Sequence, residues 1–339
     1  MINFDYLLLF FISLIIQLLF VKKGLVIGKL FGILDKPSKG KIHLKTTPLV
    51  GCFPVVLVGL IYLIYFNKNI GLIPDINLIY FFSITFFFIG ILDDKYNLNA
   101  YFKLFVSAAI FILISIYFSN FSVKLIYIET LDKYLSLDKE LSAVFTTLCI
   151  LLLLNALNLS DGINGLASGY AGFCILILST FILKNESYFL FFSIFIIINT
   201  FIIIKGYYFL GDSGTLFLGC FISLSLIFIY NDNLASGNIL SVEKIFILLM
   251  IPGIDMFRLF IERLKNKKDP FSRDLDHLHH MLLKLYRLKI TLILYFFIFF
   301  LTNFLSLKNL IKPITIILLY LFLYVFFIFL YKKKFKNSS

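Results

Sequence analysis

Charged residues are scarce in this sequence, and their scarcity excludes an ordinary water-soluble domain. They make up only 15% of the 339 positions, whereas hydrophobic residues make up 60% and the mean hydropathy is +0.98. Soluble domains are typically about 45–50% apolar. Apolar stretches of about 17–25 residues, long enough to cross a bilayer as a helix, recur from one end of the chain to the other. We therefore expect an integral membrane protein.

Three further features are missing. The four cysteines form no CxxC pair and have no histidine nearby, which argues against disulfides and against a cysteine metal site. The first apolar run, 6–21, lacks the basic start and the cleavage site of a signal peptide, so we expect it to remain as a span. No internal repeat, linker or second domain is evident, which predicts a single integral membrane domain over residues 1–339.

Windows of about 19–20 apolar residues predict an all-α fold, a polytopic bundle of about 10–11 transmembrane helices. The predicted spans lie near residues 6–21, 49–66, 73–92, 102–119, 140–158, 166–183, 187–204, 214–230, 243–257, 290–306 and 312–331.

The basic residues predict the orientation of these spans. One set of alternate loops holds 23 of the 31 Lys and Arg residues, and the other set holds eight. The positive-inside rule then places the N-terminus outside and the C-terminus in the cytoplasm. Because the charges lie between the apolar runs, the net charge of +12 does not indicate nucleic-acid binding. The outer loop 120–139 contains a strand-like alternation that predicts a small hairpin.

Unusual polar residues gather on the loops assigned to the cytoplasm. Asp93 and Asp94 lie at the end of the third span, where charges are costly and often mark function, although a solvated helix end is the simpler alternative. Asn155 and Asn158 lie three apart at the end of the fifth span, and Asp161 follows them at the same spacing. A turn would account for Asn and Asp beside glycine. It would not need this many polar side chains.

Two more loops on the same side carry candidate ligands. Gly211, Asp212 and Ser213 lead into a predicted helix, whose free N–H groups suit a phosphate; N-capping by Ser213 is the simpler explanation. The second of these loops holds His277, His279 and His280. With no cysteine nearby, hydrogen bonding to phosphate oxygens is favoured over zinc. Carboxylate and amide oxygens together are typical of Mg²⁺ and of phosphoryl-group chemistry.

Over nearly its whole length the chain resembles the polyprenyl-phosphate N-acetylhexosamine-1-phosphate transferases. This family includes the phospho-MurNAc-pentapeptide translocase of peptidoglycan synthesis and the GlcNAc-1-phosphate transferases that initiate O-antigen and related glycans. The resemblance rests on the motifs above and on residues 35–37, Lys41 and His43 of the first loop. Residues 270–280 are closer to the glycan-initiating branch. Asn164 stands where many members have a second Asp.

The resemblance implies that a lipid phosphate attacks the β-phosphorus of a UDP-sugar, giving a polyprenyl-diphosphate-sugar and UMP. It implies Mg²⁺ as cofactor, or Mn²⁺ in its place, held by Asp212 and Asn158. Asp93 would deprotonate or position the lipid phosphate, and Asp94 and Asp161 would complete the acidic centre. The implied substrate contacts are Lys41, His43, Asn155, Asn164, Gly211, Ser213, His277, His279 and His280.

The resemblance also implies a multi-pass protein of the bacterial inner membrane with its active site at the cytoplasmic face, and it leaves a homodimer open. Within the family, the pentapeptide translocase is the alternative activity. A secondary transporter would show related halves and ionisable groups near mid-span, which are not evident. A prenyl synthase would need a third Asp at position 97, where Asn97 stands. A purely structural anchor would explain the hydrophobicity but not the polar loops.

Overall fold

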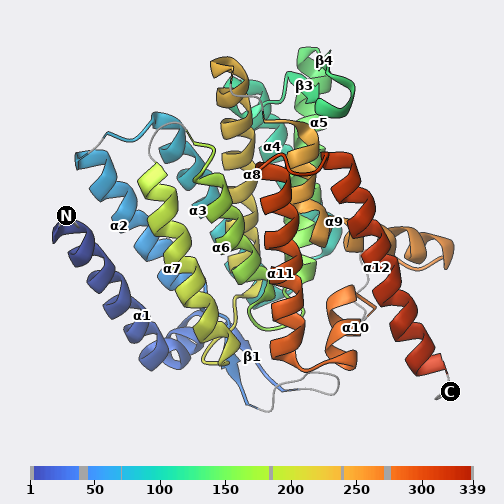
Figure 1. Ribbon diagram of the computed structural model, residues 1–339. Helices are drawn as coiled ribbons and strands as arrows, with labels where there is room; N and C mark the ends of the chain where they lie inside the picture. The colour runs from blue at the N-terminus through green and yellow to red at the C-terminus, as the bar shows by residue number, and fades with distance from the viewer. Residues whose placement is uncertain are drawn as a thin grey trace. The chain divides into compact units, whose positions relative to one another are not determined.

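The computed structural model describes residues 4–37, 45–69, 71–182, 186–237, 240–270 and 276–336. Helices make up most of it (Figure 1), as the apolar windows predict. The long helices are α1 (Phe4–Phe31), α2 (Phe53–Asn69), α3 (Pro74–Tyr96), α4 (Ala100–Tyr117), α5 (Lys139–Ser160), α6 (Leu166–Leu178), α7 (Glu186–Ile204), α8 (Gly211–Ser236), α9 (Val242–Lys265), α11 (Leu288–Leu307) and α12 (Pro313–Lys336).

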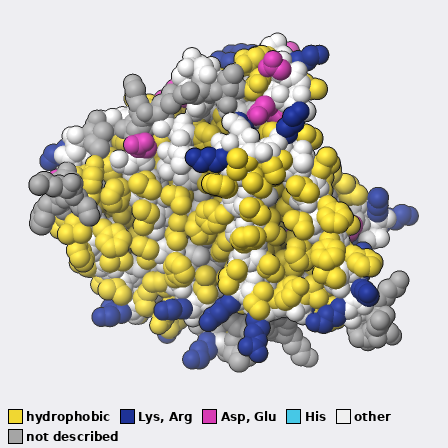
Figure 2. Space-filling model, in the orientation of Figure 1, with side chains coloured by type: hydrophobic (Ala, Val, Ile, Leu, Met, Phe, Trp, Pro, Cys, Tyr) yellow, Lys and Arg dark blue, Asp and Glu magenta, His cyan; other side chains and the backbone are white. Residues whose placement is uncertain are grey.

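Eight of these helices are long and apolar enough to cross a membrane: α1, α3, α4, α5, α7, α8, α11 and α12. Helices α2 and α6 are apolar but shorter. Hydrophobic side chains cover most of the surface seen in Figure 2, and many are widely exposed, such as Phe322 at 70%. Surface of this kind is stable only in lipid. The prediction of an all-α, multi-pass membrane protein is confirmed.

The described chain separates into two compact units. The first unit contains Met1–Ser107 and Asn164–Asn233, and thus α1, α2, α3, α6, α7 and α8. In this unit α6 packs along α7, and α2 packs against both α1 and α7. Two short strands, β1 (Leu34–Asp35) and β2 (Thr47–Pro48), pair in antiparallel register after α1.

A buried polar network fixes the segment that enters α8 in the first unit. The Tyr208 hydroxyl donates to Asn199 Oδ1 at 2.6 Å, and Gln17 Nε2 of α1 donates to the same oxygen at 2.8 Å. Asn199 Nδ2 in turn donates to the Gly51 carbonyl at 2.9 Å. The Gly51 N–H donates to the Phe209 carbonyl, also at 2.9 Å. Because residues near Gly51 are held in this way, α2 begins at Phe53 instead of near residue 49 as predicted.

The second unit contains Ala108–Ile163 and Leu234–Ser339, and thus α5, α9, α11, α12 and the short helix α10 (Leu278–Leu285). Its strands β3 (Leu125–Ile128) and β4 (Lys133–Ser136) form an antiparallel hairpin, which confirms the prediction for loop 120–139. The Glu243 carboxylate at the start of α9 accepts the backbone N–H groups of Glu129 and Thr130 at 3.0 and 2.9 Å.

Helix α9 is longer than the predicted span 243–257. It continues to Lys265 because its charged residues pair with one another at helical spacing: Arg258 contacts Asp255 at 3.1 Å and Glu262 at 2.8 Å. The sequence prediction did not include α10, whose eight residues are too few to register as a span.

Candidate active site

Helices α3 and α8 of the first unit touch backbone to backbone. A Cβ atom at Gly90 would lie 2.3 Å from the Cα atom of Ser213 and 2.6 Å from the carbonyl oxygen of Asp212. Only glycine allows this approach. The contact places the end of α3, with its two adjacent aspartates, beside the first turn of α8.

Asp94 caps α8 from a distant part of the chain. Its carboxylate accepts the backbone N–H of Asp212 at 2.8 Å and that of Ser213 at 3.0 Å. A carboxylate at a helix N-terminus satisfies free donors and is favoured by the helix dipole. The structure therefore gives the cap to Asp94 and not to Ser213, which lies inside the first turn. The sequence could not show this because a cap is normally sought within a few residues of the helix.

Gly211 is required at this turn for two reasons. Its φ of +72° lies in the left-handed region, and an added Cβ would lie 2.8 Å from Asp94 Oδ2. The next residue, Asp212, is half-buried, and its charge lies close enough to Asp94 to repel it. Two carboxylates held together at a helix N-terminus form a donor set that suits a hard divalent cation.

Asp93 has a different environment from its neighbour Asp94. It is 2% exposed, accepts the Leu98 N–H at 2.8 Å, and forms an ion pair with Lys103 in the first turn of α4. These contacts close the turn between α3 and α4. In the sequence, Lys103 is distinguished only as one of the 23 basic residues on the loops assigned to the cytoplasm. The structure adds it to the site, one-fifth exposed beside a buried carboxylate.

In the second unit the turn that follows α5 approaches the histidines. Asn155, Asn158 and Asp161 lie at the end of α5 and in the turn that follows, each partly exposed. A Cβ at Gly162 in this turn would lie 2.4 Å from His279 Nε2 and 2.7 Å from Nε2 of its neighbour His280. The close approach of this backbone to the imidazoles explains the glycine.

The three histidines form one buried cluster at the start of α10. Ring centroids lie 5.1 Å apart for His277 and His279 and 4.3 Å apart for His279 and His280. Burial holds the pKa of the His279 imidazole well below its usual range, and His280 acts in the same direction. His279 is therefore neutral at neutral pH, and its buried Nε2 atom has no hydrogen-bond partner in the described part of the chain.

Asp255 of α9 is a site residue that the sequence analysis did not identify. Its carboxylate contacts His277 Nδ1 at 2.9 Å and accepts the Leu278 N–H at 3.0 Å. It also accepts the Tyr324 hydroxyl at 2.8 Å and Arg258 Nη2 at 3.1 Å. The only sequence signal is an acidic residue within an apolar run, three positions before an Arg.

Three potential ligand atoms, from Asp255, His277 and His279, lie within 4.8 Å of one another and could hold a metal ion. Both oxygens of Asp255 are already occupied by N–H and O–H donors, one of them the Arg258 cation. A closed zinc site also typically needs about four ligands. A hydrogen-bonded cluster is the better description of these residues.

The predicted site residues thus form two groups, one in each unit. Asp93, Asp94, Gly211, Asp212 and Ser213 belong to the first unit, as does Asn164. The second unit holds Asn155, Asn158, Asp161, His277, His279 and His280. Lys41 and His43 lie outside the described residues.

The sequence pattern of glycosyl transferase family 4 matches residues 76–230. The matched segment contains Asp93, Asp94, Asp161 and Asp212, and separate curated relatives align over about three quarters of the chain. Residues 76–230 of this chain therefore resemble glycosyl transferase family 4. The resemblance noted in the sequence is thereby confirmed.

Individual relatives show how far the similarity extends. An undecaprenyl-phosphate alpha-N-acetylglucosaminyl 1-phosphate transferase of Thermotoga maritima is 28% identical over 256 residues, which cover 76% of this chain and 75% of that protein. A probable undecaprenyl-phosphate N-acetylglucosaminyl 1-phosphate transferase of Bacillus subtilis is 28% identical over 271 residues, 74% and 70% of the two chains. A phospho-N-acetylmuramoyl-pentapeptide-transferase of Prochlorococcus marinus is 31% identical over 175 residues, but these cover only 48% of each chain.

Proposed function

We propose that this protein transfers an N-acetylhexosamine 1-phosphate from a UDP-sugar to a polyprenyl phosphate such as undecaprenyl phosphate. The observation that carries the proposal is the similarity, over about three quarters of the chain, to family members named as N-acetylglucosaminyl 1-phosphate transferases. The product would be a polyprenyl-diphosphate-sugar, which begins a cell-envelope glycan. The second product would be UMP.

The reaction needs little covalent help from the protein. An oxygen of the lipid phosphate attacks the β-phosphorus of the UDP-sugar, and the bond from that phosphorus to the oxygen shared with the α-phosphorus breaks. UMP leaves with that oxygen. Such phosphoryl-group transfers depend mainly on positioning and on neutralising charge.

Asp212 is the principal candidate to hold a divalent cation, with Asp94 behind it. The carboxylates repel one another, and a cation between or beside them would relieve that repulsion. When bound, Mg²⁺ or Mn²⁺ would neutralise charge on the diphosphate. Asn158 stays a proposed ligand on the basis of the family resemblance. The backbone of Gly211 and Ser213 would contact the diphosphate.

Asp93 and Lys103 are assigned to the lipid phosphate. Lys103 is the more exposed member of the pair and is able to exchange the Asp93 carboxylate for a phosphate oxygen. The freed carboxylate would then accept a proton from a monoprotonated lipid phosphate. Asp161, Asn155, Asn164 and the three histidines are assigned to the sugar and the diphosphate oxygens.

The pentapeptide transfer reaction is the second candidate, because the Prochlorococcus relative has the higher identity over its shorter match. One experiment separates the two. Membranes containing the protein are incubated with Mg²⁺, undecaprenyl phosphate and single UDP-sugars, including UDP-GlcNAc and UDP-MurNAc-pentapeptide, and the lipid product is identified by mass. We expect a lipid-diphosphate-HexNAc and equimolar UMP. No lipid product from any donor, or full activity in excess EDTA, would contradict the proposal.

Asp212→Asn provides the matched loss-of-function variant for this assay. The amide keeps the shape of the side chain but lacks the charge that a cation requires. We expect the variant to insert into the membrane and to lose turnover.

We also propose that the reaction takes place at the cytoplasmic face of the bacterial inner membrane. The support is the excess of 23 over eight basic residues on the loops that carry the acidic and histidine motifs.

A further inference from the structure

We infer that Asp255 is the positioning residue that sets the proton and the orientation of the His277 imidazole, and that Tyr324 of α12 holds Asp255 for this task. The inference rests on the proposed function, in which His277 contacts the diphosphate. It assigns a role to two residues outside the acidic motifs.

The geometry around His277 fixes its tautomer. Asp255 Oδ2 lies 2.9 Å from His277 Nδ1. A carboxylate can only accept, so Nδ1 must carry the hydrogen. The remaining ring nitrogen, Nε2, is then the atom that faces a ligand. A carboxylate bound to one ring nitrogen orients the imidazole and stabilises the positive charge that develops when the other nitrogen takes up a proton.

The same carboxylate fixes the helix on which all three histidines lie. His277 is the N-cap residue of α10, and Leu278 supplies its first free N–H, which donates to Asp255 at 3.0 Å. Asp255 is 4% exposed, so these bonds are shielded from water. One side chain therefore sets both the ring of His277 and the start of α10.

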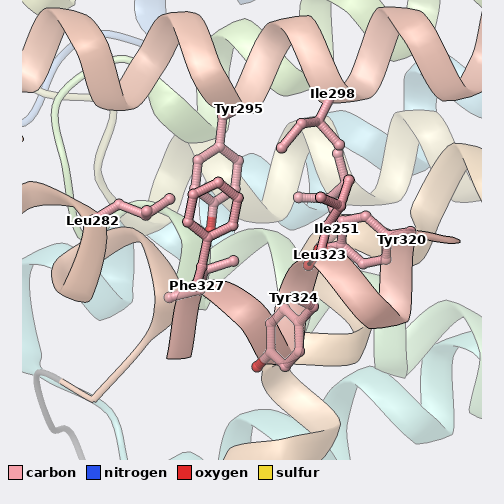
Figure 3. Close-up of a pocket in the computed structure, with 9 residues that line it drawn as sticks. Ile251, Leu282, Tyr295, Ile298, Tyr320, Leu323, Tyr324 and Phe327 are labelled. Atoms are coloured by element: carbon pink, nitrogen blue, oxygen red, sulfur yellow. Dashed lines mark hydrogen bonds between the residues drawn. The ribbon is translucent and has the colours of Figure 1, made fainter. Parts of the chain in front are cut away.

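Helix α12 supports Asp255 from the other side. The Tyr324 hydroxyl donates to Asp255 Oδ1 at 2.8 Å and accepts from Arg258 Nε at 2.6 Å. Figure 3 shows Tyr324 beside Tyr320 and Phe327 of α12, in the wall of a small apolar cavity that Leu278 and Leu282 of α10 also line. The apolar face of α10 is thus packed against α12, while its first N–H is bonded to Asp255.

The alternative is that Asp255 only balances the charge of Arg258. Arg258 has a second carboxylate partner, Glu262, which is 45% exposed and one turn away on the same helix. Glu262→Gln is therefore a matched control, because it removes a carboxylate from Arg258 without touching His277.

The test is a double-mutant cycle on the full-length protein in detergent, with the transfer assay as readout. We expect Asp255→Asn to lower kcat/KM by about 10–100-fold, mostly through kcat, since loss of an orienting carboxylate usually has an effect of this size. If Asp255 acts through His277, the double variant with His277→Gln loses no more than the worse single variant. Losses that multiply in the double variant would overturn the inference. So would an equal loss in Glu262→Gln.

A second readout does not depend on activity. The chain has only four histidines, so ¹⁵N-histidine labelling gives a simple spectrum, in which His277→Gln assigns the His277 signals. We expect Nδ1-protonated His277 in the wild type and a shift away from this tautomer in Asp255→Asn. An unchanged tautomer would overturn the inference. If the wild type transfers no sugar phosphate, the proposed function fails, and the spectrum still decides the orientation of His277.

Tyr324→Phe covers the case in which Asp255→Asn does not fold. It keeps the ring in the cavity wall and removes one donor from Asp255. We expect a several-fold fall in kcat that disappears in the His277→Gln background. A fall that persists in that background would contradict the inference.

Discussion

At the scale of single residues, the candidate site depends on places where one backbone approaches another group too closely for a side chain. Gly90 allows α3 to reach the first turn of α8, and Gly162 allows the turn after α5 to reach two imidazoles. Gly90 lies three residues before Asp93, and Gly162 directly follows Asp161. The structure shows that the glycines bring those neighbours to their partners.

Gly90→Ala should therefore lower the free energy of unfolding by about 1–3 kcal/mol, the usual effect of overpacking. The new methyl group would meet the backbone of Ser213, which cannot move without displacing Asp94 from its cap. We expect the transfer activity of Gly90→Ala to fall together with its stability. Gly253→Ala is the matched control, because nothing lies within 4 Å of a Cβ added there and alanine favours a helix by up to about 1 kcal/mol. Thermal unfolding in detergent measures the stability of the two variants. Equal unfolding midpoints for Gly90→Ala and Gly253→Ala would show that the close contact at Gly90 does not matter for stability.

The neutral state of His279 predicts a pH dependence of stability. Its pKa in the folded protein is lowered by burial, below the unfolded value of about 6.5. Folding thus favours the neutral ring. The stabilisation is fully present above about pH 6.5 and is lost as the pH falls below that value, because the unfolded chain binds the extra proton more readily.

Thermal unfolding between about pH 7.5 and about pH 5 measures this effect. We expect the wild-type midpoint to fall over this interval, and His279→Gln to show a smaller fall. An identical pH dependence in the two proteins would exclude His279 as the source.

At the scale of elements, the apolar helices and the outer hairpin could be predicted from the sequence because their signals are local. An apolar stretch of bilayer length or an alternating strand pattern is visible within about 20 residues. Helix α10 and the role of Asp255 could not be predicted in this way. Asp255 and His277 lie 22 positions apart, and Asp94 caps a helix 118 positions away. Such pairs become visible only when the helices have packed.

The network that leads into α8 gives a prediction at this scale. Tyr208→Phe removes the hydroxyl that joins Gln17 and Asn199, so each of these buried groups loses one of its hydrogen bonds. The expected loss of stability is about 1–3 kcal/mol. Because Tyr208 lies three residues before Gly211, we also expect the Mg²⁺ concentration for half-maximal activity to rise.

Tyr207→Phe is the matched control for this prediction. Tyr207 is the neighbouring tyrosine and is 54% exposed, so its hydroxyl is replaced by water contacts at little cost. Unfolding midpoints and Mg²⁺ titrations of the two variants should differ. Indistinguishable variants would show that the network does not hold the turn.

At the scale of the whole molecule, α9 differs from the eight helices that are long and apolar enough to cross a bilayer. Helix α9 has an apolar first half and a second half with Asp255, Arg258, Glu262 and Arg263. Isolated charges would make a crossing costly. Here Arg258 contacts both Asp255 and Glu262, which reduces that cost. The charge asymmetry of the loops predicts that α9 crosses the membrane.

Cysteine labelling in intact cells tests this crossing and the orientation together. In a background without the four native cysteines, Ala235→Cys precedes α9 and Lys268→Cys follows it, and both native side chains are exposed. Asn233 would be a poor choice, because its side chain is buried and bonded to the Phe181 carbonyl at 2.9 Å. We expect an impermeant maleimide to label position 235 in intact cells and position 268 only after permeabilisation. Labelling of both positions in intact cells would show that α9 does not cross. The reverse pattern would invert the orientation and place the histidine cluster, with the diphosphate chemistry assigned to it, on the outer side.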